Sequence, residues 1–114
     1  MRLSFSIILT IFFMALTFSD PARAQVKAPM TASQIRDLCA SKYDIDFGIC
    51  AGYVTAVAER LMSGEAPVCL SPAVSPQLLV TNVVKAWDHA PPGPQDSAAG
   101  AVEQALRQRF ACPR

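Results

Sequence analysis

Four cysteines, Cys39, Cys50, Cys69 and Cys112, are the feature that most constrains how this chain can fold. Zinc sites usually pair their ligands at short C-x2-C spacing, whereas these cysteines lie much further apart and the sequence holds a single His. An even number of cysteines in a short exported chain typically forms disulfides. If the chain is exported, the sequence predicts two disulfide bonds, and three pairings are open at this point.

The N-terminal residues provide the evidence for export. A positive start precedes a mostly apolar stretch over residues 3–18, and Ala22-Arg23-Ala24 supplies the small residues that a signal peptidase recognises. Asp20-Pro21 ends the apolar stretch before it reaches the roughly 20 residues that a membrane-spanning helix needs. We expect residues 1–24 to be a secretory signal cleaved after Ala24. The mature chain, residues 25–114, is then periplasmic and not inserted in the membrane.

The mature chain is short and nearly neutral. It forms one domain at most, because domains typically have about 50–200 residues. The signal removes two Arg and one Asp, which leaves eight basic and eight acidic residues. Nucleic acids and anionic membranes bind clustered Lys and Arg, so neither is an expected partner.

Capping residues and apolar spacing predict four short helices. Thr31 and Gln34 match a capping box, Asp44 and Asp46 are expected to cap the second helix, and Ser75-Pro76 is typical of a helix start. The β-branched stretch 80–84 could instead be a strand, but the cap and the spacing favour a helix. The helices are expected to run from Thr31 to about Ala40, from about Asp46 to Ser63, from Ser75 to Ala90 and from about Ser97 to Phe110.

Four helices with short links predict an all-α fold, a small up-and-down bundle. In such a bundle Cys39 and Cys50 lie near one pole, and Cys69 and Cys112 lie near the other. A bond between Cys50 and Cys69 would span the second helix, about 20 Å at 1.5 Å per residue, whereas the Cα atoms of a disulfide lie about 6 Å apart. The pairs Cys39–Cys50 and Cys69–Cys112 are therefore preferred.

Groups for catalysis are sparse. His89 is the only His, and Asp88 beside it could orient the ring only if the backbone bends. Asp44 and Asp46 are better explained as helix caps than as a catalytic pair. The sequence contains no G-x-S-x-G, HExxH or glycine-rich phosphate loop. We predict a protein that is not an enzyme and that needs no metal or cofactor.

The most unusual stretch is Trp87–Asp96, whose sequence is WDHAPPGPQD. Its prolines make it stiff, and a stiff projecting loop loses little conformational entropy when it docks on a partner. The alternative is a plain link between helices, with Trp87 in the core. If the stretch is a contact loop, the candidate partner-binding residues are Trp87, Asp88, His89, Pro91, Pro92, Pro94, Gln95 and Asp96.

The second helix carries a further candidate surface. Gly48, Gly52 and neighbouring Ala residues form a smooth strip where another helix could approach closely. The alternative is ordinary packing inside the monomer.

Three segments together resemble the Rap/Tai family of immunity proteins, which are exported partners of type VI secretion effectors. They are Phe47-Gly48-Ile49-Cys50-Ala51-Gly52-Tyr53-Val54, Cys69-Leu70-Ser71-Pro72 and Phe110-Ala111-Cys112-Pro113, and the resemblance covers about Ile35 to Pro113. It implies that residues 25–114 form a helical, disulfide-bonded periplasmic immunity domain that is often dimeric. Family members bind and block peptidoglycan amidases, partly with a protruding loop that occludes the catalytic cleft. They commonly carry a Tyr-Leu pair and a single Pro where this chain has Trp87-Asp88 and its Pro-rich stretch.

Two functions from different classes follow. The leading hypothesis is a periplasmic immunity protein that binds and inhibits a peptidoglycan-amidase effector of type VI secretion. The alternative is a general periplasmic structural or chaperone-like binding protein with no dedicated effector.

Overall fold

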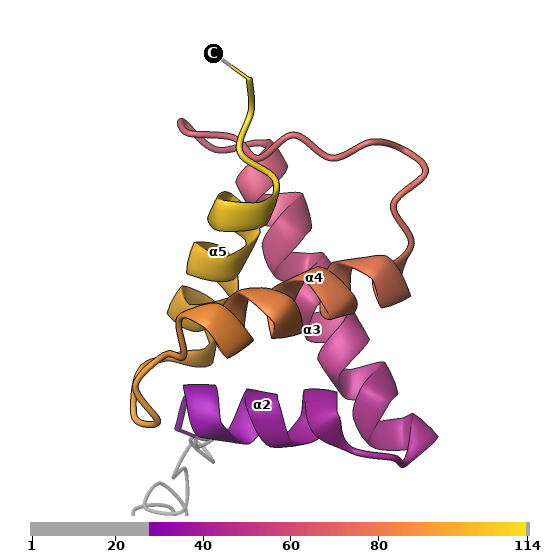
Figure 1. Cartoon of the computed structure of the whole chain (residues 1–114), viewed down its shortest axis with the longest axis vertical. Helices are drawn as coiled ribbons and strands as arrows, with labels where there is room; N and C mark the ends of the chain where they lie inside the picture. The colour runs from indigo at the N-terminus through magenta and orange to yellow at the C-terminus, as the bar shows by residue number, and fades with distance from the viewer. Residues whose placement is uncertain (1–27, 114) are drawn as a thin grey trace, which may run out of the picture.

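The computed structural model describes residues 28–113, so the expected signal peptide and its cleavage point after Ala24 lie outside the described residues. Four helices and no strand form in this part of the chain, which confirms the predicted all-α fold. None of these helices is long and apolar enough to cross a membrane. The helices are α2 (Ala32–Ala40), α3 (Asp44–Met62), α4 (Pro76–His89) and α5 (Ala98–Arg109) (Figure 1).

Three of the four helices begin at side-chain caps, and the sequence predicts two of them, Thr31 and Ser75. The Thr31 hydroxyl accepts the Gln34 N–H at 3.3 Å, and the Gln34 side chain accepts the Thr31 N–H at 2.9 Å, which completes the capping box. The Ser75 hydroxyl accepts the Leu78 N–H at 3.2 Å at the start of α4, and the Ser97 hydroxyl accepts the Gly100 N–H at 3.1 Å at the start of α5. These caps satisfy N–H groups that a helix leaves unpaired at its start.

The start of α3 differs from the prediction. The helix begins at Asp44, its N-cap is Tyr43, and no side chain caps it. Asp46 instead accepts a hydrogen bond from the Ser41 hydroxyl at 2.6 Å. Both Asp44 and Asp46 lie in the first turn, where negative charge is favoured by the helix dipole. The two carboxylates therefore stabilise the helix end electrostatically and not as caps.

The helix axes cross in this bundle. Figure 1 shows α3 and α5 running up the view while α2 and α4 lie across it, so the four axes are not parallel as an up-and-down bundle would have them. Small residues explain how α4 crosses α5 closely: Ala101 and Ala105 of α5 are buried. The β-branched stretch 80–84 lies inside α4, as predicted.

One core holds the four helices together. The predicted apolar stripes of α3, α4 and α5 face inward, while Phe47, Val84 and Phe110 pack against the core from its margin. No polar or charged residue of the described chain is buried. The largest fully buried side chains are Ile35, Leu106, Val54, Val83, Val102 and Cys50.

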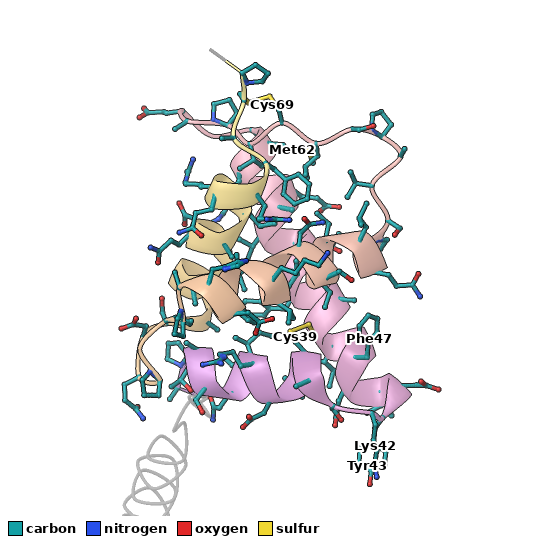
Figure 2. All side chains as sticks on the ribbon, in the orientation of Figure 1. Cys39, Lys42, Tyr43, Phe47, Met62 and Cys69 are labelled. Carbon is teal, nitrogen blue, oxygen red and sulfur yellow. A yellow bond between two sulfur atoms is a disulfide. The ribbon has the colours of Figure 1, made fainter. Side chains whose placement is uncertain are left out.

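Two disulfides form, with the pairing that the bundle argument favoured. Cys39 bonds Cys50 with their Cα atoms 5.1 Å apart, and Cys69 bonds Cys112 with their Cα atoms 4.9 Å apart. Figure 2 shows the Cys39 sulfur just above α2 and Cys69 at the top of the view, near the C-terminal end, so the two bonds are well separated. The first fixes the corner between α2 and α3, and the second fastens the long α3–α4 link to the chain after α5.

Candidate partner-binding segment

The predicted contact segment begins at the end of α4, where Trp87 is an anchor. Its side chain is 4% exposed, and its indole Nε1 donates to the Ala101 carbonyl of α5 at 3.2 Å. The helix stops at His89 because the next residues include Pro91 and Pro92, which cannot continue it. Trp87 thus fixes where the segment leaves the core, and its ring is not available at the surface.

A tight turn shapes the far end of the segment. The Asp96 N–H donates to the Gly93 carbonyl at 3.0 Å, and the Asp96 carboxylate accepts the Gly93 N–H at 2.9 Å. A Cβ at Gly93 would lie 3.0 Å from that carboxylate, so glycine permits the close approach. Pro94 lies inside the turn and restricts its backbone further. Two reciprocal hydrogen bonds and a proline therefore hold the tip in one shape.

The turn is also fastened to the start of α2. The carbonyls of Pro94 and Asp96 accept the backbone N–H groups of Ser33 at 3.2 Å and Ala32 at 2.7 Å. A third backbone hydrogen bond runs in the opposite direction, from the Ala98 N–H to the Met30 carbonyl at 2.9 Å. The segment between α4 and α5 therefore supplies acceptors that the first turn of α2 needs. This role was not predicted, because backbone carbonyls are alike in every residue and leave no pattern in the sequence.

Most of the segment faces solvent. Asp88, His89, Pro91, Pro94, Gln95 and Asp96 are exposed and Pro92 is half-buried, while Trp87 alone is buried. Pro94 also forms one wall of a shallow cleft of about 330 Å³ against the outer side of α2, which contributes Arg36 and Asp37. The structure thus brings seven of the eight predicted contact residues to the surface and places α2 side chains next to them.

The described residues form no cluster suited to hold a metal. No group of three His, Cys, Asp or Glu side chains gathers within residues 28–113. Asp88 and His89 occupy consecutive exposed positions at the end of α4. All four cysteines are consumed in disulfides.

A second exposed apolar surface lies at the start of α3. Tyr43 is 64% exposed, Ile45 78% and Ile49 49%. Figure 2 shows Lys42 and Tyr43 projecting together from the corner between α2 and α3, and the Lys42 ammonium lies 5.7 Å from the centre of the Tyr43 ring. The surface predicted for this helix consisted of its small residues and did not include the exposed isoleucines. A signal was present, since Ile45 and Ile49 are four residues apart and share a helix face.

A comparison with known families bears on this arrangement. A family model for Rap1a immunity proteins matches residues 31–112, which include all four helices and both disulfides. No curated protein and no solved structure matches the chain significantly.

Proposed function

The chain belongs to the Rap1a immunity protein family, and on that premise we propose that it is a periplasmic immunity protein that binds a peptidoglycan-amidase effector of type VI secretion and inhibits it by occluding its active site. The family supports an immunity role through a protein effector. The amidase target, the inhibition and export by a signal cleaved after Ala24 are parts of the proposal.

One observation supports occlusion most directly: the segment between α4 and α5 projects while its backbone is held. Its turn is closed by Asp96 and Gly93, and its carbonyls are bonded to α2. Fixing one residue of a mobile loop costs about 1–2 kcal/mol. A loop already ordered in the free protein avoids much of that cost on binding, so more of the contact energy remains as affinity.

The proposal assigns separate roles along the segment. Pro91, Pro94 and Gln95 are exposed and offer the contacts, together with Asp88 and His89 at the end of α4. Trp87 anchors the base from within the core.

The first experiment identifies the partner. Tagged mature protein is recovered from its own host, and the co-eluting proteins are identified by mass spectrometry. A single stoichiometric peptidoglycan amidase supports the proposal. A spread of unrelated envelope proteins would favour the chaperone-like alternative and count against a dedicated effector.

The second experiment tests the segment with matched variants. The recovered effector is titrated with the wild type, with Gln95→Ala and Pro91→Ala, and with Gln77→Ala, an exposed control in the first turn of α4. We expect the two loop variants to weaken inhibition about 30-fold or more, which corresponds to the roughly 2 kcal/mol of an interface hot spot. Unchanged inhibition by both loop variants would place the contact elsewhere.

The third experiment tests export. The full chain is expressed, the periplasm is fractionated, and the N-terminus of the recovered protein is sequenced. The proposal requires a mature chain that begins at Gln25. A cytoplasmic protein that retains its first residues would refute it.

A further inference from the structure

A large cleft runs along α2, next to the smaller cleft at Pro94. It measures about 870 Å³ and extends from Ala28 and Thr31 at the start of the helix to Ser41 and Tyr43 beyond its end. Pockets that bind ligands typically have volumes of about 300–1,000 Å³. The cleft is therefore large enough to receive a whole side chain of a partner protein.

The large cleft adjoins the segment between α4 and α5. Asp37 and Ala40 line both this cleft and the smaller one that Pro94 borders. Figure 1 shows the α4–α5 link beside the start of α2, and Figure 2 shows Tyr43 projecting from the corner after its other end. The nine residues of α2 rise only about 14 Å between these two points. A standard interface buries about 800 Å² on each partner, so a protein bound at Pro94 would reach the large cleft as well.

The large cleft carries two carboxylates. Asp37 is exposed on α2, and Asp46 is half-buried, with one oxygen held by the hydrogen bond described above. Within the described chain, no Lys, Arg or His lines the cleft or forms an ion pair with either carboxylate. Of the basic residues nearest in sequence, Arg36 lines the smaller cleft, and the Lys42 ammonium lies 5.7 Å from the centre of the Tyr43 ring. The large cleft is therefore acidic and favours a cation.

The rest of the cleft is mostly apolar. Met30 and Leu38 form part of its walls, and both also pack against the core from its margin. The Tyr43 ring, which is 64% exposed, belongs to the same lining. An arginine side chain covers apolar surface with its methylene stem, pairs with carboxylates through parallel N–H groups and binds the faces of aromatic rings. One arginine would therefore match the charge, the walls and the ring of this cleft.

We infer that the large cleft along α2 is a second contact point of the partner interface, and that it receives an arginine side chain which the effector presents beside the active site covered by the segment between α4 and α5. The inference rests on the proposed function and adds to it the charge that the partner carries at this point. Asp37 and Asp46 bind the guanidinium, and the apolar walls bind the stem. A charged contact of this kind speeds association and selects among partners. Two separate contacts also fix how the partner is oriented, because one contact alone leaves rotation about it free.

The first test uses the protein that is recovered by affinity purification. Asp37→Lys places a positive charge in the cleft, and the dissociation constant should rise about 30-fold or more. Glu65→Lys makes the same change at an exposed position of the α3–α4 link and should leave the constant unchanged. Equal constants for the two variants overturn the inference. The proposed function still stands in that case if Pro91→Ala and Gln95→Ala weaken inhibition.

A peptide titration tests the cleft itself and decides the inference even if no effector is recovered. The mature, oxidised protein is titrated with N-acetyl-leucyl-arginine amide and with the neutral citrulline analogue, and backbone amide shifts are followed by NMR. The arginine peptide should shift the amides of Leu38 and Tyr43 saturably and bind about fivefold more tightly than the citrulline peptide. Asp37→Asn should remove this difference.

Three results of the titration contradict an arginine site. Equal binding of the two peptides to the wild type overturns the inference, and so does the absence of a saturable shift at millimolar peptide. Shifts that appear only after residues 25–27 are removed would place the chain's own N-terminal residues in the cleft, which also overturns it.

Discussion

Removal of the Cys69–Cys112 bond should destabilise the domain more than the loss of any single surface contact. The bond closes a loop with a sequence separation of 43 and fastens the α3–α4 link to the chain after α5. The perturbation is the double variant Cys69→Ala/Cys112→Ala. Cys69 is exposed and Cys112 half-buried, so little core packing is lost with the sulfur atoms.

The magnitude follows from the length of the closed loop. The chain-entropy model assigns about 4 kcal/mol to this bond and about 2.8 kcal/mol to the Cys39–Cys50 bond, whose separation is 11. Domains of this size have a total stability of about 5–15 kcal/mol. Each kcal/mol moves the melting temperature of a 60–100-residue domain by about 4–8 °C, so a drop of roughly 15–30 °C is expected.

Three contacts remain when the bond is absent. Val68 is 4% exposed, the Cys69 N–H donates to the Phe110 carbonyl at 2.8 Å, and the Arg107 guanidinium donates to the Ala66 carbonyl. They should keep the folded link near its position. The loss therefore falls on the free energy of unfolding and not on the helix content of the folded state.

The assay is urea denaturation and thermal melting followed by circular dichroism. Ala111→Ser, an exposed neighbour of the bond, serves as the control and should change the free energy of unfolding by less than about 0.5 kcal/mol. A loss below about 1 kcal/mol in the double variant would refute the reasoning. It would mean that the remaining contacts already restrict the unfolded chain or hold the link without the bond.

Three smaller changes test single contacts. Asp96→Ala removes the acceptor of the Gly93 N–H and should lower the free energy of unfolding by about 1 kcal/mol. Amide hydrogen exchange at Gly93 should become faster, and unchanged exchange would contradict the prediction. Trp87→Phe removes the hydrogen bond to the Ala101 carbonyl and some core volume, so urea denaturation should show a free energy of unfolding about 2 kcal/mol lower. An unchanged free energy of unfolding would show that Trp87 does not anchor the segment. Thr55→Val removes a buried hydroxyl that has no hydrogen-bond partner, so the free energy of unfolding should stay unchanged or rise by up to about 1 kcal/mol. A clear decrease would show that the hydroxyl is hydrogen-bonded.

Much of the fold could be predicted because its signals are local. The Thr31–Gln34 capping box and the Ser75-Pro76 start each act within one helical turn, so the sequence alone reveals them. The disulfide pairing followed from the expected order of the helices, which places Cys39 and Cys50 near one pole of the bundle and Cys69 and Cys112 near the other, and from a second helix too long for Cys50 to reach Cys69. The crossing of the helices was not predictable in this way, because it depends on side chains from different helices meeting in space.

The predictions were wrong where a side chain has two possible hydrogen-bond partners, and they were incomplete where backbone groups make the contact. Asp46 has the side chain of a good cap, but the Ser41 hydroxyl donates to its carboxylate, and the helix begins earlier. The candidate contact segment was located from its prolines, yet its attachment to α2 was not foreseen. That attachment uses the carbonyls of Pro94 and Asp96, which any residue would offer.

Backbone carbonyls hold the segment between α4 and α5 against α2, so its exposed side chains can change without loss of the attachment. Substituting exposed side chains between His89 and Asp96 leaves the acceptors for Ala32 and Ser33 in place, provided that Gly93 and Asp96 keep the turn closed. The backbone hydrogen bonds that hold the segment are therefore independent of the side chains that it exposes. New surfaces can therefore be displayed at the same position on an unchanged scaffold, and recognition can diversify without loss of the fold.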